Sequence, residues 1–109
     1  MGELQRNARR AVPLLKAMSN PARLVILCQL AEGERSVGEL EAQVGLSQSG
    51  ISQHLAVLRR HQVVDTRRER QMVFYRLASS EVAALMAALH EAFCAPAGPV
   101  RPPRAKALA

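Results

Sequence analysis

Apolar residues in the first half of the chain recur at intervals of three and four, which is the spacing of one face of an α-helix. The first such segment spans residues 4–18, where Pro13 marks either a kink or a later start of the helix. A second helix is predicted to begin at Asn20-Pro21, because asparagine caps helix starts and proline favours the first helical position. We expect it to end at residues 32–34. Its apolar face comprises Leu24, Leu27, Cys28 and Ala31.

Two further helices follow in close succession. Ser36 and Glu39 have the spacing of a capping box, which predicts a short helix that stops at Gly45. Ser47 is then placed to cap a helix over residues 48–61. Because only a tight turn separates the two, the pattern is that of a helix-turn-helix. The inward positions of the first of these helices are Val37, Leu40 and Val44.

The pattern changes after position 61. Runs of β-prone residues at 63–67 and 72–77 flank an arginine-rich stretch, and side chains in the second run alternate with the period of a strand. These runs predict a two-stranded hairpin with a basic tip. Ser80 is expected to cap a last helix over residues 81–94. The fold class is therefore mainly α with a small β-hairpin.

The composition fits one small domain with a polyanionic partner. We assign residues 1–94 of the 109 to this domain and expect the proline-rich residues 95–109 to form a disordered tail. Apolar residues make up 49% but aromatic residues only 3%, so the core is modest and oligomerisation would add stability. The net charge is +6, and all but two of the cations are arginines, which suit phosphates and base edges.

The chain is expected to be soluble and cytoplasmic, without membrane contact. No stretch approaches the roughly 20 apolar residues of a membrane span, and the N-terminus lacks the apolar run of a secretory signal. In a reducing cytosol, Cys28 and Cys94 would not form a structural disulfide. Inert burial, metal binding and redox sensing remain as roles for these cysteines.

The helix predicted over residues 48–61 has one apolar and one polar face. Ile51, Leu55 and Leu58 would be buried, while the polar face could reach base edges and phosphates in a major groove. A merely solvated face is the alternative, but the tight turn, the cap and the basic hairpin together favour DNA binding. We expect His54, at the flank, to be structural or to contact the DNA backbone. The predicted DNA-binding residues are Gln48, Ser49, Ser52, Gln53, Arg60, Arg67, Arg68 and Arg70.

The chain resembles the ArsR/SmtB family of bacterial winged-helix repressors in three strings: LLKAMSNPARLVILCQL, SVGELEAQVGLSQSGISQHLAVLRRHQVV and TRRERQMVFYRL. The similarity covers about residues 12–94 in order, and LSQSGISQHLAVLR is specific to that family's recognition helix. The resemblance implies a winged helix-turn-helix of order α-α-α-α-β-β-α. It also implies a homodimer, with the first and last helices at the interface, that binds an inverted-repeat operator in double-stranded DNA.

Members of this family sense metals, metalloids or reactive sulfur at different places. The cysteine motif that one branch carries before the turn is absent from SVGELEAQV. A second branch places metal ligands along the last helix, where His90 is here the only histidine and Ser79 and Phe93 occupy the other positions. Both common metal sites are therefore missing from the sequence, and no metal or other cofactor is expected.

Cys28 and Cys94 resemble the paired thiols of a narrower group, the persulfide-sensing biofilm growth-associated repressors, in the strings VILCQLAEG and LHEAFC. This resemblance implies that the reduced protein represses, and that small persulfides or stronger oxidants bridge the cysteines and release DNA, with sulfide-detoxification genes as expected targets. His90, one turn before Cys94, either favours its thiolate or is only a polar flank residue.

Three other interpretations compete with this one. The same cysteines could serve a metal or metalloid sensor, although two thiols are few for zinc, which usually takes four ligands. The chain could also bind DNA constitutively, with incidental thiols. A thiol enzyme is the third, but the sequence has no Cys-X-X-Cys motif, no nucleotide loop and no paired carboxylates at catalytic spacing. We therefore expect no enzymatic activity.

Overall fold

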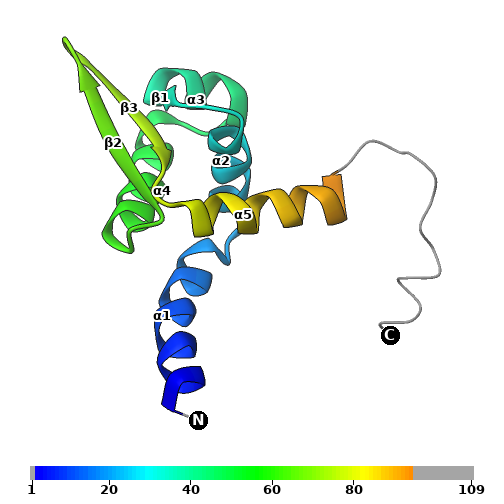
Figure 1. Ribbon diagram of the computed structural model, residues 1–109. Coiled ribbons are helices and arrows are strands. Elements are labelled where there is room, and N and C mark those ends of the chain that lie inside the picture. Colours follow the sequence, from blue (N-terminus) through cyan, green and yellow to red (C-terminus); the bar gives the residue numbers. More distant parts are fainter. Residues whose placement is uncertain (1, 95–109) are drawn as a thin grey trace.

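The elements follow one another in the predicted order, with one strand added. The computed structural model describes residues 2–94, so the tail predicted at 95–109 lies outside the described residues. Figure 1 shows α1 (Gly2–Met18), α2 (Pro21–Ala31), β1 (Arg35–Ser36), α3 (Val37–Val44), α4 (Gln48–Arg60), β2 (Val64–Glu69), β3 (Met72–Leu77), α5 (Ser80–Leu89) and the π-helical turn η1 (His90–Cys94). Apart from β1, this order confirms the predicted fold class.

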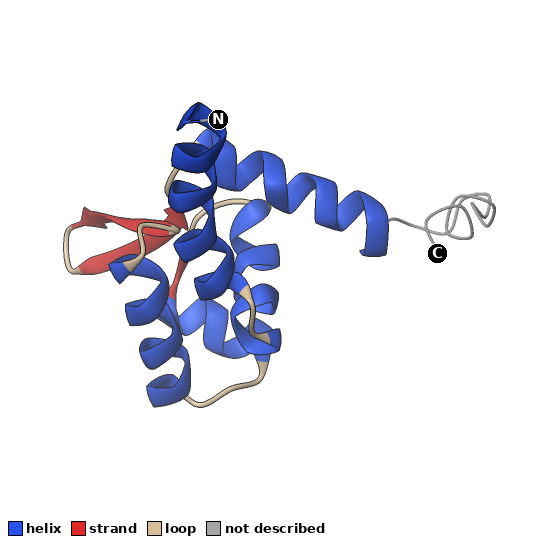
Figure 2. Cartoon of the chain, turned by 90° about the horizontal axis from the view of Figure 1, so that it is seen from below, coloured by secondary structure: helices blue, strands red, loops and turns tan. Residues whose placement is uncertain are grey.

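Helices α2, α3 and α4 form the centre of the molecule. The β2–β3 hairpin projects from this centre on the side opposite to η1, as Figures 1 and 2 both show. Helices α1 and α5 leave the centre in different directions, as two arms (Figure 1). The hairpin and α4 therefore lie at one side of the molecule, away from the end of the α5 arm.

The sheet has three antiparallel strands in the order β1-β3-β2. The predicted hairpin is confirmed, although β2 runs to Glu69, opposite Met72, rather than ending at residue 67. Strand β1, which pairs Arg35 with Tyr75, was missed. Two residues are too few to reveal the alternation of a strand, and their pairing depends on a partner that lies far along the chain.

The core is aliphatic, and every α-helix contributes to it. Helix α1 contributes only at its last turn, whereas α2 and α4 each contribute three residues. Because the buried set contains no aromatic side chain among the described residues, the core stays modest, as the composition predicts. Its members are Ala17, Met18, Ile26, Leu27, Leu30, Leu40, Ile51, Leu55, Leu58, Val63, Val64, Val82 and Met86.

Side-chain hydrogen bonds mark the helix starts, and one of them differs from the prediction. Ser36 and Glu39 form both bonds of the predicted capping box. At the last helix the N-cap is Ser79 and not Ser80, since Ser79 Oγ accepts from the backbone N–H of Val82 at 3.2 Å. Both serines have suitable side chains, and only the extended backbone at Ser79 decides between them.

Two helices depart from the regular pattern. Helix α1 continues through Pro13, so the alternative of a helix starting there is wrong. The last predicted helix, 81–94, is α-helical only over Ser80–Leu89 and continues as a π-helix over His90–Cys94. Because π-helical hydrogen bonds span five residues instead of four, the direction of the last side chains cannot be counted from α-helical geometry.

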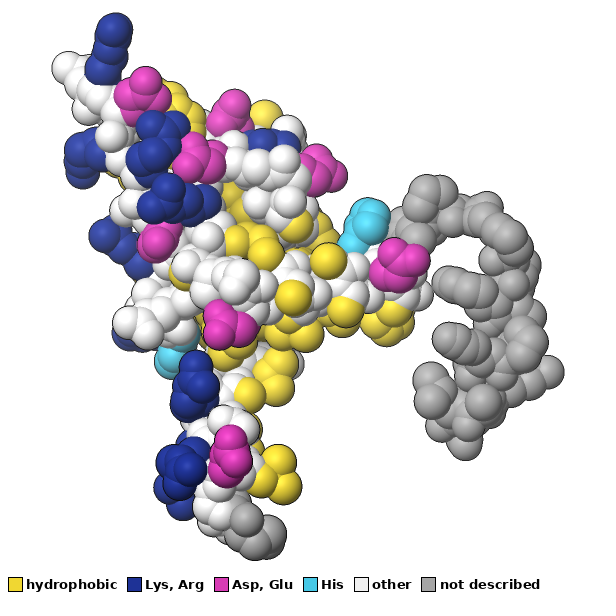
Figure 3. Space-filling view, in the orientation of Figure 1, with side chains coloured by type: hydrophobic (Ala, Val, Ile, Leu, Met, Phe, Trp, Pro, Cys, Tyr) yellow, Lys and Arg dark blue, Asp and Glu magenta, His cyan; other side chains and the backbone are white. Residues whose placement is uncertain are grey.

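Both arms carry large apolar side chains in solvent. Leu4 is 69% exposed and Phe93 is 80% exposed, while Val12 and Leu15 on α1 are exposed to almost half of their surface. Figure 3 shows apolar side chains along the lower side of α5 and along the side of α1 that faces it. Apolar faces of this kind are typical of subunit interfaces.

No single helix among residues 2–94 is long and apolar enough to cross a membrane. Helices α1 and α2 meet that criterion only when they are counted together across the 101° bend between them.

Candidate functional site

Helix α4 presents the polar face that the sequence predicts. On its inner side Ile51, Leu55 and Leu58 are at most 1% exposed, so packing fixes the rotation of the helix about its axis. The predicted helix residues are all exposed on the other side: Gln48, Ser49, Ser52, Gln53 and Arg60. Small hydroxyls, amides and an arginine on an exposed helix face can enter a major groove and hydrogen-bond to base edges.

The turn between α3 and α4 sets the position of α4. Gly45 ends α3 with a φ of 84°, and its N–H donates to the carbonyl oxygen of Glu41 at 3.2 Å. A side chain would be strained in this left-handed conformation, which explains the glycine. Ser47 Oγ then accepts from the N–H of Gly50 at 3.1 Å and starts α4. A specific hydrogen bond therefore fixes the chain on each side of the turn.

His54 lies half-buried behind the exposed face of α4 and contacts Arg23 of α2. The distance between His54 Nδ1 and Arg23 Nη1 is 3.4 Å. Arg23 Nε also donates to the carbonyl oxygen of Ala17, in the last turn of α1. One guanidinium thus joins the end of α1 to the middle of α4, and this contact supports a structural role for His54.

The β2–β3 hairpin is the wing beside this helix-turn-helix. It ends in a two-residue turn, Arg70-Gln71, where Arg70 has a φ of 59°. Few residues other than glycine adopt this left-handed conformation. Arg68 and Arg70 are both exposed and provide the positive charge near the tip.

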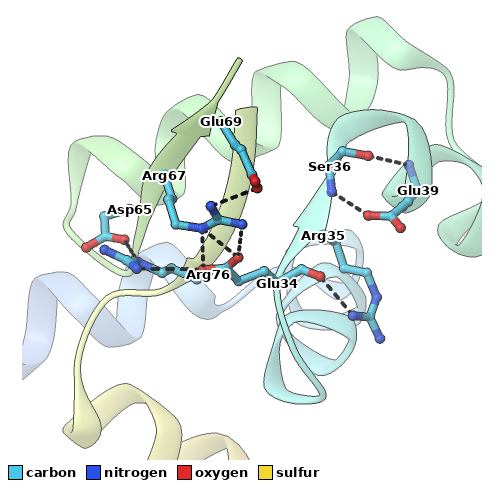
Figure 4. Close-up of polar contacts among 8 residues, drawn as sticks. All are labelled: Glu34, Arg35, Ser36, Glu39, Asp65, Arg67, Glu69 and Arg76. Carbon is cyan, nitrogen blue, oxygen red and sulfur yellow. Dashed lines mark hydrogen bonds and ion pairs between the residues drawn. The ribbon is translucent and has the colours of Figure 1, made fainter. Parts of the chain in front are cut away.

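Arg67 lies further from the tip and is held by two carboxylates (Figure 4). Its guanidinium lies 2.8 Å from Glu34 Oε1 and 3.1 Å from Glu69 Oε1. It also stands 4.9 Å from the centre of the Phe74 ring. Arg67 therefore differs from Arg68, because it would have to give up two ion pairs before it could contact a DNA phosphate.

Glu34 connects both strands of the wing to the segment before α3. Besides Arg67, it contacts Arg76 at 3.6 Å, and Arg76 Nε donates to Asp65 Oδ1 at 2.7 Å. The hydrogen bond from Arg67 is the main reason why the pKa of Glu34 lies below its ordinary value. The same bond is the main reason why the pKa of Arg67 is raised. Since these side chains are partly exposed, the network orients the wing more than it stabilises the fold.

Cys28 lies on α2 beside a cavity of about 500 Å³ between α2 and α5. It is half-buried and packs against the core, and Met86 forms part of the apolar wall of the cavity. His90 and Glu91, the first residues of η1, border the same cavity. Cys94 is the last residue of η1, and its side chain lies outside the described part of the structure. The chain therefore brings the segment that carries Cys94 to the cavity beside Cys28.

Two parts of this site gave no signal in the sequence. The pairing of Glu34 with Arg67 joins residues 33 positions apart, and the contact of Arg23 with His54 spans 31 positions. Charged residues at such separations follow no local period. As for metal ions, no group of three or more His, Cys, Asp or Glu side chains within the described residues is arranged to hold one.

Known proteins match the chain over most of its length. A sequence profile of bacterial regulatory proteins of the arsR family matches residues 20–66. The transcriptional activator HlyU of Vibrio cholerae is 54% identical over 92 residues, which cover 84% of this chain and 85% of that protein. The chain belongs to the ArsR family. A biofilm growth-associated repressor of Agrobacterium fabrum, another relative of this ArsR-family protein, is 50% identical over 93 residues, covering 85% and 80% of the two chains. The protein is thus a DNA-binding transcriptional regulator.

Solved structures of the family agree with this fold. The structure of reduced HlyU from Vibrio cholerae has a TM-score of 0.81 at 53% identity and covers 87% of this chain and 100% of that one. A homodimeric winged helix-turn-helix domain from Mycobacterium bovis has a TM-score of 0.74 at 30% identity, covering 84% and 85%. The winged helix predicted for this ArsR-family protein is confirmed, and the predicted homodimer agrees with that neighbour.

Proposed function

We propose that this ArsR-family protein is a cytoplasmic, homodimeric repressor that leaves its operator when reactive sulfur bridges Cys28 and Cys94. The observation that carries the proposal is that the cavity beside Cys28 is bordered by His90 and Glu91, in the short turn that ends at Cys94. The proposed direction of control follows the 50% identity to a biofilm growth-associated repressor, whereas HlyU, at 54% identity, is named an activator. That one solved relative is described as reduced HlyU fits a thiol pair that changes its redox state.

In the repressing state, each subunit would place α4 in a major groove and its wing beside the DNA backbone. Gln48, Ser49, Ser52 and Gln53 are the proposed base-reading residues, because they share the exposed face of α4. Arg60, Arg68 and Arg70 are the proposed phosphate contacts, and Arg67 contributes only if it leaves its carboxylates. The two copies of α4 would lie about 34 Å apart, one turn of DNA, to meet two half-sites.

The proposed chemistry transfers sulfur without any other oxidant. The Cys28 thiolate attacks the outer sulfur of a small persulfide, RSSH, and RS⁻ leaves, so that Cys28 becomes a persulfide. The Cys94 thiolate then attacks the sulfur bonded to Cys28 Cβ, and HS⁻ leaves, which forms a Cys28–Cys94 disulfide. If a second persulfide first lengthens the chain, the bridge contains extra sulfur atoms. His90, at the rim of the cavity, is placed to favour a thiolate there.

The bridge has to weaken the free energy of DNA binding by only a modest amount. A hundredfold loss of affinity corresponds to about 2.7 kcal/mol of coupling between bridge formation and DNA binding. Helices α2 and α5 pack on each other, and α5 continues into η1, where Phe93 is part of the exposed apolar surface expected to meet the partner subunit. A sulfur link between α2 and η1 would therefore act on the dimer and on the spacing of the two copies of α4.

The test combines intact mass with a DNA mobility shift. An operator duplex is first selected from a random library by the wild-type protein, which is then treated with glutathione persulfide or, as a control, with oxidised glutathione. We expect persulfide to bridge the two cysteines of the wild type and to abolish the shifted band. The intact mass should fall by two hydrogens for a disulfide, or rise by whole sulfur atoms less two hydrogens for a longer bridge. Cys28→Ser and Cys94→Ser should keep DNA binding but lose the response. If persulfide released the Cys28→Ser variant from DNA as it releases the wild type, the paired-thiol proposal would be refuted. If stoichiometric zinc or arsenite released the wild type from DNA, a metal or metalloid sensor would be favoured.

A further inference from the structure

A second basic surface lies next to the C-terminal end of α4. A depression of about 640 Å³ separates α1 from the end of α4 and the start of α5. Arg9 and Arg10 of α1 and Arg60 of α4 line it. Among the residues that line it, Glu81 is the one carboxylate, so three arginines face one acid and the depression carries net positive charge.

The two arginines of α1 stand opposite its apolar side. At 100° per residue, Arg9 and Arg10 lie on the other side of the helix from Leu4 and Leu15. Leu4 and Leu15 are among the exposed apolar residues that fit a subunit interface. A dimer that covers this apolar side would therefore leave the arginine side of α1 open to solvent.

Arg60 belongs to this depression and also to the proposed DNA-binding face. It is exposed on α4, and on its other flank it lines a groove with Ser52 and Tyr75, between α4 and the wing. Figure 3 shows Lys and Arg side chains along one flank of the molecule, from the wing down to α1. The segment Ser80–Cys94 of the α5 arm contains neither Lys nor Arg. The positive charge therefore continues from the wing, past α4, onto α1.

A bound duplex is long enough to reach this surface. Helix α4 rises about 16 Å from Ser49 to Arg60, at 1.5 Å per residue. One turn of DNA is about 34 Å long, so a duplex that lies along α4 does not end at Arg60. Its sugar-phosphate backbone would continue toward Arg9 and Arg10, whose guanidinium groups suit phosphate oxygens.

We propose that Arg9 and Arg10 of α1 bind the phosphate backbone of DNA beside the bases that α4 reads, with Arg60 as the contact that both surfaces share. This inference rests on the proposed DNA-binding face and adds α1 to it as a second DNA-binding element. Because phosphates carry no sequence information, α1 raises affinity and its salt dependence but leaves the preferred sequence unchanged. Glu81 opposes the phosphate in the same depression.

The experiment measures how DNA affinity depends on salt. A fluorescent duplex of about 30 base pairs, selected from a random library by the wild-type protein, is titrated between about 50 and 200 mM NaCl. The variants are R9Q/R10Q, E81Q and the control R6Q/K16Q, which removes the same charge from α1 but outside the depression. Thermal melting and sedimentation establish that each variant is folded and dimeric.

Two arginines in each subunit give four phosphate contacts per dimer, so R9Q/R10Q should lower the slope of log affinity against log salt by about 3 to 4. The wild type should therefore lose about 150-fold more affinity than this variant over that salt range. E81Q should bind more tightly than the wild type, and R6Q/K16Q should change the slope by less than about 1. The preference of R9Q/R10Q for the selected duplex over a scrambled one should equal that of the wild type.

An unchanged slope in R9Q/R10Q would overturn the inference, and so would an equal reduction in R6Q/K16Q, which would indicate a general charge effect. Loss of sequence preference in R9Q/R10Q would also overturn it, because α1 would then act by misplacing α4. Binding of the wild type to anionic vesicles that R9Q/R10Q abolishes, with no change in DNA slope, would assign the surface to membranes instead. If the wild type selected no duplex at all, the proposed DNA-binding face itself would fail.

Discussion

Gly50 and Ser47 should be energetically coupled, because a side chain at position 50 would contact Ser47, the N-cap residue of α4. Ser47 Oγ accepts from the N–H of Gly50 at 3.1 Å. A Cβ atom added to Gly50 would lie 3.3 Å from the same Oγ, which is tighter than most contacts of this kind. Alanine at position 50 therefore improves the helix backbone and disturbs the cap at the same time.

The two effects have similar magnitudes and opposite signs. Replacing glycine by alanine in a helix stabilises it by about 1 kcal/mol, while losing a serine N-cap costs about 1 kcal/mol. Gly50→Ala alone should therefore change the free energy of unfolding by less than about 0.5 kcal/mol. In a Ser47→Ala background no hydroxyl remains to be displaced, and the same substitution should then stabilise by about 1 kcal/mol. The expected coupling energy is about 1 kcal/mol.

The assay is urea unfolding of the wild type, the two single variants and the double variant. All four are measured at one protomer concentration, since the apparent stability of a dimer depends on it. If Gly50→Ala stabilised the protein equally in both backgrounds, the contact between the added Cβ and the cap would have no energetic effect and the reasoning would be wrong.

Three further predictions concern the fold around the site. Leu55→Ala, at a position that is 1% exposed, should lower the free energy of unfolding by about 2–5 kcal/mol in urea unfolding. Glu34→Gln should make the free energy of unfolding fall less steeply as the pH is lowered. The pKa of Glu34 is lowered in the folded state, so its ionised carboxylate stabilises the fold above the ordinary pKa of 4.5, and this stabilisation is lost as the pH falls through the lowered value. Unfolding measured at a series of acidic pH values tests this, and an unchanged limb would contradict it. Arg23→Met should cost about 1–3 kcal/mol, because it removes the bonds from a charged donor to Ala17 and His54. A loss below about 0.5 kcal/mol would argue against that junction.

Local signals predicted the helices that carry the site. Ser36 with Glu39, Gly45 and Ser47 mark ends where one side chain or one φ value satisfies a backbone group nearby in sequence. The buried side of α4 followed from the same helical period, and its three predicted inward residues are buried. Features governed by residues a few positions away were therefore readable without the structure.

Features that depend on distant residues or on fine backbone geometry were not readable. Strand β1 exists because Arg35 pairs with Tyr75, 40 positions later. The wing arginines form one run in the sequence, yet Arg67 is held by Glu34 and Glu69 while Arg68 remains exposed. The apolar spacing also gives no sign of the change from α-helix to π-helix after Leu89, because it does not reveal which backbone groups are hydrogen-bonded.

The charge distribution explains how so basic a chain can present a defined DNA-binding face. Of the net charge of +6, half lies in residues 95–109, which hold three cations and no acid. Within the described residues, Arg67 and Arg76 of the wing are paired with three carboxylates, of which Glu34 lies before β1. The exposed arginines beside the proposed DNA-binding face are therefore those of α4, the wing tip and α1, and the hairpin strands themselves add little to the positive charge.

The position of Arg23 explains how a change at Cys28 could reach that helix. Both residues lie on α2, five positions and about 7.5 Å apart along the helix axis. Through Arg23, α2 contacts the end of α1, whose exposed apolar side fits the dimer interface, and His54 on α4. Hydrogen bonds from a charged donor contribute about 1.5–3 kcal/mol each, which is the range of coupling that a hundredfold change in DNA affinity needs. The proposed bridge would therefore need to shift α2 only far enough to weaken contacts at this one guanidinium.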